Sequence, residues 1–288
     1  MLGHKVFQVL RRELPGTACT LRGGVEALPP AARTLFPAGE TLTGVDVRDE
    51  TRLRALLEER RPDVVVNCVG VVKQRPEAND PLLSISVNSL LPHQLAAWCR
   101  PWEGRVIHVS TDCVFSGRRG PYREEDEIDA TDLYGKTKAL GELGPDEGLT
   151  LRTSIIGREL AHGASLLEWL LARRGTSVRG FTRVLWSGVT TNYLARLLAR
   201  IVRERPDLAG LYQVAGEPVS KHELLVRLDA AFGAGVVIEP DPSPVSDRRL
   251  VGERFVAETG WRTPPWDALL PELASDPTSY DSIRKGNS

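Results

Sequence analysis

The sequence contains no apolar run that approaches the ~20 residues a membrane-spanning helix needs. Charged residues, among them Lys5, Arg11 and Glu13, interrupt its first segment, so no secretory signal peptide is indicated. Positive charge is not in excess either, because the formal net charge of the 288 residues is −1. These absences argue against a membrane span and against nucleic acid or an acidic membrane as the main partner, and they predict a cytoplasmic protein.

Cysteine and histidine are scarce and are not arranged for metal binding. The five histidines include no pair at the spacing typical of metal ligands. The four cysteines are not paired at such a spacing either, and several lie in apolar runs: Cys19, Cys68, Cys99 and Cys113. The sequence therefore predicts buried thiols in a reducing compartment and no metal site.

Short apolar runs alternate with amphipathic patterns over the first two thirds of the chain. Continuous Val/Ile/Leu strands between helices are typical of a parallel sheet that is covered on both faces. The pattern predicts an α/β fold with a doubly wound, Rossmann-like parallel sheet. We expect strands at 17–21, 64–66, 105–110 and 149–154, and helices at 5–13, 51–60, 81–98 (interrupted near Pro92) and 134–143.

The pattern becomes looser after about residue 155. We expect helices at 166–173, 192–203 and 221–232 and short strands at 211–214 and 236–238. The proline-rich stretch 239–247 is predicted to be a loop, and the polar tail from about residue 275 to be frayed.

Tyr134 and Lys138 stand four residues apart in a predicted helix, which places their side chains on one face. A tyrosine has a pKa near ~10, and a neighbouring ammonium would lower it toward neutrality. Thr111 ends an apolar strand upstream and points to the same place. The Tyr/Lys spacing alone occurs by chance in many chains. A hydroxyl, a phenol and an ammonium around one point, however, suit proton transfer to an oxygen that gains or loses a hydride.

A glycine-rich turn is missing at the start of the chain. Dinucleotide-binding α/β domains open with a strand and such a turn, because glycines let the backbone approach the pyrophosphate. Here Met1 to His4 leads directly into a helix, and only Gly3 suits the turn. We expect a start truncated by about seven to ten residues, which would leave a buried sheet edge exposed. A natural enzyme without its first strand is the alternative.

These stretches resemble the extended short-chain dehydrogenase/reductase superfamily and, within it, the dTDP-4-dehydrorhamnose reductase branch. S-T-D-x-V-F-x-G at 110–117 and Y-G-K-T-K at 134–138 carry the resemblance most specifically. The segments 1–4, 46–47 and 66–70 are similar to that family's glycine turn, its adenine-packing pair and its segment after the fourth strand. D-R-R-L at 247–250 and T-G-W-R-T-P-P-W at 259–266 are similar to the branch's closing segment.

The resemblance implies roles for individual residues. Thr111 would hold the substrate carbonyl oxygen, Tyr134 would protonate it, and Lys138 would lower the tyrosine pKa and bind the nicotinamide ribose. Further cofactor contacts are implied at Gly3, His4, Asp46, Val47, Asn67, Cys68, Val69, Gly70, Thr153 and Ser154. Substrate contacts are implied at Val71, Val72, Lys73, Gln74, Asp112, Val114, Arg179 and Trp186. A structural role is the alternative for Asn67, Lys73, Arg179 and Trp186, and Asp112 either orients the Thr111 loop or binds the sugar.

Cofactor preference is indicated by Arg22, at the end of the second predicted strand. No acid stands there to bind a ribose 2′-hydroxyl, and a guanidinium suits a 2′-phosphate. We therefore expect NADPH (NADP) as cofactor, with NADH (NAD) as the alternative; a solvated loop charge is the other interpretation of Arg22. Val251 departs from the aspartate that similar reductases often have, so substrate contacts there would differ.

We expect residues 1–154 to form a dinucleotide-binding domain that lacks its first strand. Residues 155–288 would form mainly a small α/β substrate-binding lobe, with segments that return to the main sheet. The expected function is NADPH-dependent reduction of a nucleoside-diphosphate 4-keto-deoxysugar, in nucleotide-sugar, dTDP-rhamnose or polysaccharide synthesis, and the superfamily implies a homodimer. The alternatives are an epimerase or dehydratase, because Asp112 adjoins Thr111, and a non-catalytic NADP-binding regulatory subunit, because the glycine turn is missing.

Overall fold

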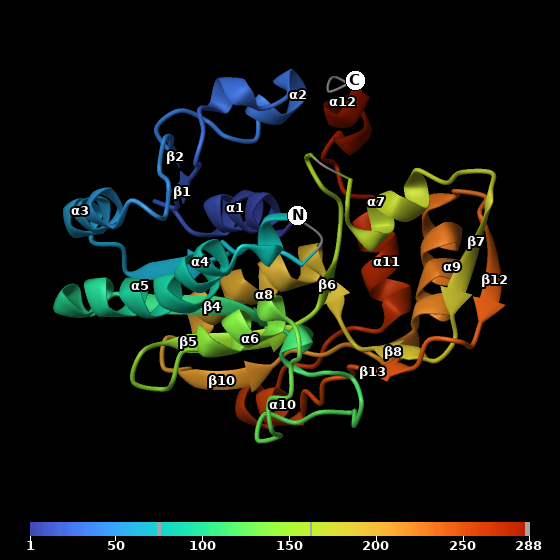
Figure 1. Cartoon of the computed structure of the whole chain (residues 1–288). Coiled ribbons are helices and arrows are strands. Elements are labelled where there is room, and N and C mark those ends of the chain that lie inside the picture. Colours follow the sequence, from blue (N-terminus) through green and yellow to red (C-terminus); the bar gives the residue numbers. More distant parts are fainter. Residues whose placement is uncertain (74–75, 162, 286–288) are drawn as a thin grey trace.

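The computed structural model describes residues 1–73, 76–161 and 163–285 (Figure 1). Its centre is a four-stranded sheet in the order β10-β5-β4-β3, and all three strand pairs are parallel. The strands are β3 (Val64–Asn67), β4 (Arg105–Thr111), β5 (Leu149–Thr153) and β10 (Gly210–Gln213). Parallel strands end at a common edge, so the residues that follow β3, β4 and β5 lie close together.

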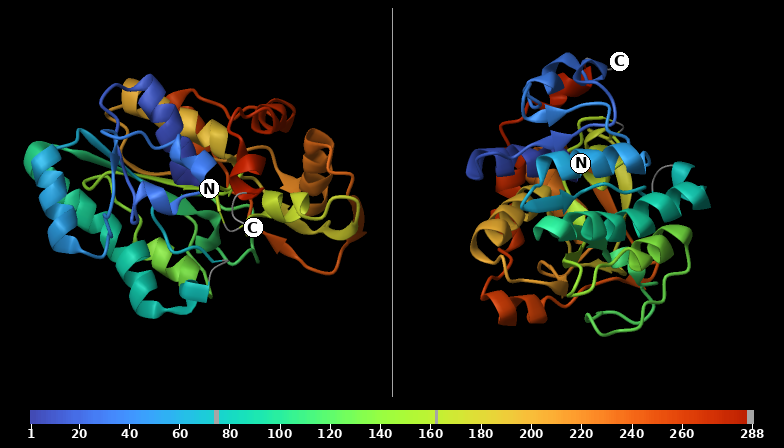
Figure 2. Two further views of the ribbon diagram at one scale, coloured as in Figure 1. Left: turned by 90° about the horizontal axis from the view of Figure 1, so that it is seen from above. Right: turned by 90° about the vertical axis from the view of Figure 1, so that its left-hand side faces the viewer.

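Helices cover both faces of this sheet. Adjacent residues of a strand point to opposite faces, and Val106 and Ile107 on β4 are both fully buried. Val106 packs in a cluster with α3 (Glu50–Arg60) and α5 (Leu91–Cys99). Ile107 packs in a second cluster with α1 (Leu2–Glu13) and α8 (Thr191–Glu204). The fold is thus the predicted doubly wound α/β fold, with its helices in two layers around the sheet (Figure 2).

The expected strand at 17–21 is a shorter strand in a separate sheet. β1 (Cys19–Thr20) pairs in parallel with β2 (Thr41–Leu42), and within the described residues neither pairs with β3. The prediction of a buried strand at 64–66 is only partly right. Val64, Val65 and Val66 are half-buried, because β3 is an edge strand that, in the part of the chain that the structure describes, pairs with β4 alone. Between β1 and β2 lie the helices η1 (Val25–Ala27) and α2 (Pro30–Arg33).

The predicted long helix at 81–98 is interrupted by a wider turn. Asp80 caps α4 (Pro81–Ser84), because its carboxylate accepts the backbone N–H groups of Leu82 and Leu83. A π-helical segment, η3 (Ile85–Leu90), then leads into α5. Pro92 has no N–H group to donate, and a π turn tolerates the missing bond. The neighbouring helix α6 (Leu133–Leu140) is tied to η3 where the Ser89 hydroxyl donates to the Thr137 carbonyl at 2.8 Å.

The C-terminal half adds three small sheets. They pair β7 (Ser177–Phe181) with β12 (Val237–Asp241), β8 (Val184–Trp186) with β11 (Val219–Ser220) and β13 (Ser246–Asp247), and β6 (Ile155–Ile156) with β9 (Val189–Thr190). The loop predicted at 239–247 is therefore wrong at both of its ends. Among the described residues β12 pairs only with β7. Pro240 therefore fits this strand, because its missing N–H costs no second ladder bond. The remaining elements are η2 (Pro76–Asn79), η4 (Arg100–Trp102), η5 (Asp112–Val114), α7 (Leu166–Leu171), α9 (Lys221–Phe232), α10 (Glu253–Thr259), α11 (Trp266–Ala274) and α12 (Tyr280–Lys285).

The prediction of a frayed tail is wrong up to the end of the described residues. Tyr280 and Ile283 on α12 are buried, and the Tyr280 hydroxyl lies 2.9 Å from His4 Nε2. Lys5 Nζ lies 2.6 Å from an Asp276 carboxylate oxygen, and both side chains are almost inaccessible. The polar residues of the tail are therefore used in a buried contact with α1. None of the helices among the described residues combines the length and the apolar character that crossing a bilayer requires.

Breaking the buried Lys5–Asp276 pair should destabilise the fold. Replacing one member of a buried ion pair leaves the other charge without compensation, which typically costs ~3–5 kcal/mol. We expect Lys5→Met to lower the free energy of unfolding by that amount in urea denaturation. Lys136→Met, at an exposed position of α6, is the control and should change it little. A loss of less than about 1 kcal/mol for Lys5→Met would place the pair in effectively hydrated surroundings.

Candidate functional site

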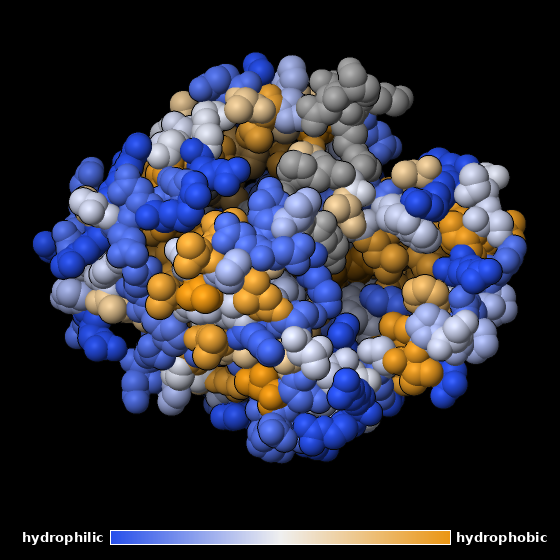
Figure 3. Space-filling model, in the orientation of Figure 1, coloured by the Kyte–Doolittle hydropathy of each residue, from blue (hydrophilic) through white to orange (hydrophobic). Residues whose placement is uncertain are grey.

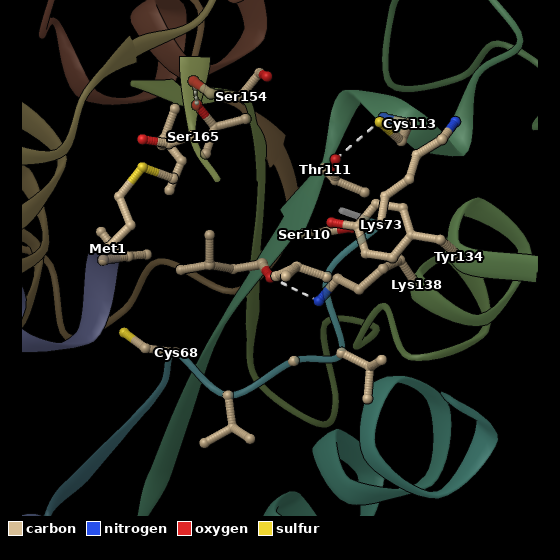
Figure 4. A pocket seen from close by; sticks show the side chains of 18 of the residues that line it. Met1, Cys68, Lys73, Ser110, Thr111, Cys113, Tyr134, Lys138, Ser154 and Ser165 are labelled. Carbon is tan, nitrogen blue, oxygen red and sulfur yellow. Dashed lines mark hydrogen bonds between the residues drawn. The ribbon is translucent and has the colours of Figure 1, made fainter. Parts of the chain in front are cut away.

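A cavity of about 670 Å³ opens at the carboxyl ends of the central strands (Figure 4). Its wall combines the start of α1, the loop after β3, the end of β4, one face of α6 and the segment after β5. Among the lining residues are Met1, Gly3, Cys68, Val69, Gly70, Val71, Lys73, Ser110, Thr111, Asp112, Cys113, Tyr134, Lys138, Thr153, Ser154 and Ser165. Thr111, Tyr134 and Lys138 therefore face one cavity, as their order in the chain predicts.

A glycine brings Tyr134 to the end of β4. A Cβ atom on Gly135 would lie 2.2 Å from the Cys113 carbonyl oxygen, so only glycine allows α6 to approach this closely. Asp132 fixes the start of the helix by accepting the Gly135 N–H at 2.8 Å. Thr111 Oγ1 accepts the Cys113 N–H at 3.1 Å, which holds this hydroxyl at the end of β4.

Lys138 points toward β4 rather than toward the phenol. Its Nζ atom donates to the Val109 carbonyl at 2.9 Å and lies 3.0 Å from His108 Nε2 (Figure 4 shows the first contact). Burial lowers the pKa of Lys138 to about 8, while Glu142 acts in the opposite direction. Its neutral form is therefore more accessible than that of an ordinary lysine.

The predicted lowering of the Tyr134 pKa by Lys138 is not found in this geometry. Burial raises the pKa of Tyr134 above its ordinary value, the neighbouring Cys113 adds to the shift, and the Thr111 hydrogen bond opposes it. The reason is that the lysine head group is bound to β4 and not to the phenol. In this arrangement Tyr134 is a neutral hydrogen-bond donor, which is the form that can protonate an oxygen.

The loop after β3 is held by two buried asparagines. Asn67 Oδ1 accepts the Val69 N–H at 3.0 Å. Asn88, which is on η3, accepts the Val71 N–H at 2.9 Å and donates to the Val71 carbonyl at 3.2 Å. Asn67 is among the site residues predicted from the sequence, whereas Asn88 is not. The one sequence feature that points to Asn88 is that a polar residue stands in an otherwise apolar helix.

A second cavity of about 260 Å³ shares part of this loop with the first. Val69, Gly70, Val71 and Glu77 line both cavities. The rest of the smaller cavity's wall includes Thr20, Arg22, Asp46, Val47 and Arg48. The structure therefore brings Arg22 together with the 46–47 pair. Arg48 lies there too, although it is not among the residues predicted from the sequence. Arg48 binds the Asp46 carboxylate through two nitrogens and lowers the pKa of that carboxyl group to about 2.

Several predicted site residues lie elsewhere. His4 is buried against Tyr280, and burial lowers its pKa to about 3. Val114 is part of a core cluster with Phe115, so it does not reach the cavity. Arg179 is exposed and 3.7 Å from Asp241, and Trp186 is buried against Trp266. Neither Arg179 nor Trp186 lines either cavity, so their structural interpretation fits better, and Gln74 lies outside the described residues.

Lys73 and Asp112 line the larger cavity, but each is already engaged. Lys73 Nζ lies 2.6 Å from an Asp132 carboxylate oxygen on a partly exposed surface. Asp112 is buried beneath Thr111, whose hydroxyl donates to Asp112 Oδ1 at 3.2 Å. Burial raises the pKa of Asp112, whereas the nearby Lys221 and Arg248 oppose the shift. Asp112 is thus placed to orient Thr111.

A doubly wound α/β fold with a Thr/Tyr/Lys set at the carboxyl edge of its sheet defines the extended short-chain dehydrogenase/reductase class. The family model for the RmlD substrate binding domain matches residues 24–236, and the chain belongs to this family.

Individual relatives agree with this assignment. A dTDP-4-dehydrorhamnose reductase of Streptomyces griseus is 29% identical over 81% of this chain, which spans 66% of that relative's length. A dTDP-4-dehydrorhamnose reductase of Bacillus anthracis, solved in complex with NADP, has a TM-score of 0.70 at 17% identity, covering 81% of this chain and 89% of that one. The UDP-glucose 4-epimerase of Thermus thermophilus, solved with NAD, has a TM-score of 0.73 at 19% identity, covering 99% and 96%. At such identities the two solved structures speak for the fold alone.

The buried amine of Lys138 should lower the stability of the fold. A fall of its pKa from 10.5 to about 8 means that the folded state disfavours the ammonium by about 3 kcal/mol below pH 8. This penalty is lost as the pH rises from about 8 to 10.5. We therefore expect Lys138→Met to raise the free energy of unfolding at pH 7 by ~1–3 kcal/mol. The gain is smaller than the full penalty because the substitution also removes the two hydrogen bonds of Lys138.

Urea denaturation between pH 6 and 10 would measure this effect. The advantage of Lys138→Met over the unmodified protein should shrink above pH 8, and Lys136→Met on the same helix should show no such trend. An advantage that is independent of pH would contradict the lowered pKa.

Proposed function

We propose that this protein is an NADPH-dependent reductase of a 4-keto-deoxysugar carried on a nucleoside diphosphate. The observation that carries the proposal is the single cavity faced by Thr111, Tyr134 and Lys138, whose wall continues into the smaller cavity beside Arg22. The Streptomyces griseus reductase supports the substrate class. When bound, the nicotinamide supplies the hydride.

The protein's own residues would handle the substrate oxygen. Thr111 would bind the carbonyl oxygen by turning its single hydroxyl proton from Asp112 Oδ1 to the substrate, while the Cys113 N–H holds the hydroxyl oxygen in place. Tyr134 would give its proton to this oxygen as negative charge develops on it. Both side chains are held in place before the substrate arrives, so little reorganisation beyond the turn of one hydroxyl accompanies the reaction.

The cofactor would extend from the larger cavity into the smaller one, along the shared wall at 69–71. Val47 would pack beside the adenosine, and Arg22 would bind the 2′-phosphate that distinguishes NADPH from NADH. Thr153 and Ser154 line the larger cavity and would lie beside the nicotinamide. The NADP-bound Bacillus anthracis reductase, which shares the fold, supports this cofactor.

The assignment extends to the whole molecule. Residues 1–154 form the cofactor domain, 155–288 mainly the substrate lobe, and the enzyme works in the cytoplasm. A second copy of the chain covers the exposed apolar side chains of Leu82, Ile85 and Leu140 on α4, η3 and α6. Figure 3 shows hydrophobic side chains gathered over α4 and α6, which are in contact with each other.

An epimerase or dehydratase is the second candidate, because Asp112 lies in the cavity wall beside Thr111. The two functions differ in their use of cofactor, since an epimerase consumes none overall. A non-catalytic NADP-binding subunit would bind the cofactor without turnover.

The function can be tested by following NADPH absorbance with dTDP-4-dehydrorhamnose as substrate. We expect net NADPH consumption, and Tyr134→Phe should lower kcat by ~10²–10⁴-fold, because it removes the proton donor but keeps the ring. Tyr212→Phe, a buried tyrosine outside both cavities, is the control. Substrate conversion without NADPH consumption would favour the epimerase or dehydratase, and NADPH binding without turnover would favour the regulatory subunit.

Cofactor selection provides an independent test. Arg22→Ala should weaken NADPH binding by ~10–100-fold in titration calorimetry, the loss expected for charge-assisted hydrogen bonds to a phosphate. NADH binding should be unchanged, and Arg60→Ala at the exposed end of α3 should affect neither cofactor. Equal losses for both cofactors would mean that Arg22 does not read the 2′-phosphate.

A further inference from the structure

Three polar side chains form a buried row beneath the site. Asn67 ends β3, His108 lies on β4 and Lys138 on α6, and they are 3%, 0% and 5% exposed. Asn67 Nδ2 lies 3.1 Å from His108 Nδ1, and His108 Nε2 lies 3.0 Å from Lys138 Nζ. The mechanism proposed above gives His108 no role.

The direction of these hydrogen bonds follows from one backbone group. The Val69 N–H can only donate, and it lies 3.0 Å from Asn67 Oδ1. The other end of the amide is therefore the NH₂ group, which donates to His108 Nδ1. A neutral imidazole has one donor and one acceptor, so His108 carries its proton on Nε2 and donates it to Lys138. An ammonium has no lone pair to accept this hydrogen bond, whereas the neutral amine has one.

The charges around the row agree with this direction. Burial holds the pKa of His108 well below its ordinary value, and Lys138 and His93 act in the same direction, so the imidazole is neutral. Two groups favour the ammonium form of Lys138 instead, namely Glu142 just after α6 and Cys68 after β3. The Glu142 carboxylate, however, is already bound by Arg152 at 2.7 Å and by the Ser110 hydroxyl at 2.7 Å.

We propose that His108 is a positioning residue that, oriented by Asn67, favours the neutral amine of Lys138 over its ammonium form. The link to catalysis rests on the proposed function. Reduction breaks the Tyr134 O–H bond as the substrate O–H bond forms, and the phenolate must regain a proton. A lysine whose neutral form is stabilised gives up its proton more readily. Because its head group is bound to β4, the proton would pass to the phenolate through a water molecule, and a proton taken up from the solvent would then restore the ammonium.

The tautomer of His108 can be measured directly by ¹⁵N NMR of the histidine rings at pH 9, with the signal assigned by His108→Phe. We expect protonated Nε2 and unprotonated Nδ1. Asn67→Asp places a carboxylate, which can only accept, beside Nδ1 and should move the proton to Nδ1. Protonated Nδ1 in the unmodified protein, or no change in Asn67→Asp, would overturn the proposal.

The effect on Lys138 can be measured by ¹³C NMR titration of the lysine ε-carbons, with the signal assigned by Lys138→Met. We expect a midpoint of about 8 in the unmodified protein. His108→Phe removes the Nε2–H donor and should raise the midpoint by one pH unit or more, a tenfold gain in proton affinity. His222→Phe on α9 is the matched control. An unchanged or lower midpoint in His108→Phe would overturn the proposal.

Both measurements use the free protein, so their outcome is independent of turnover. If the tautomer and the midpoint behave as expected but no substrate is reduced, the proposed function fails and the role of His108 in setting the charge of Lys138 stands. If NADPH is consumed, the pH profile of kcat should shift to higher pH in His108→Phe with little change in KM. Activity together with an unshifted midpoint and profile would remove His108 from the mechanism.

Discussion

The close contact between α6 and the end of β4 is the constraint on which the site depends. Gly135 lets the helix approach the Cys113 carbonyl, and Lys138 fixes the same helix from below by donating to the Val109 carbonyl. Because an amine is buried between helix and sheet, the fold gives up stability at the position where chemistry is proposed. Lys5 is also buried, at the other side of the sheet, but there the carboxylate of Asp276 compensates its charge directly.

Much of the central fold could be predicted because its signals are local. The Val/Ile/Leu runs of β4 and β5 and the amphipathic patterns of α3 and α8 each lie within one short segment of sequence. The convergence of Thr111, Tyr134 and Lys138 followed from the rule that parallel strands end at one edge. The spacing of Tyr134 and Lys138 did not determine where the ammonium points, since this depends on the Val109 carbonyl and on His108, which come from another element.

What the sequence analysis missed depends on long-range partners. Nothing near residue 276 indicates that its carboxylate meets Lys5, so a polar tail was interpreted as frayed. His4 was assigned to the cofactor because of its place in a turn, whereas its partner is Tyr280. Arg48 was overlooked because a loop arginine has no pattern of its own, and only the packing of β1 and β2 brings it beside Arg22.

The segment 69–71 forms a wall common to both cavities, and Asn88 holds it from η3. This shared wall limits how the protein can evolve by mutation. A substitution in this segment alters the walls of both cavities at once, so a change that suits one cavity would disturb the other. Residues that line one cavity but not the other can change independently, such as Arg22 and Arg48 in the smaller cavity and Ser165 in the larger one. Changes in ligand specificity should therefore begin at residues that line a single cavity and reach the shared wall last.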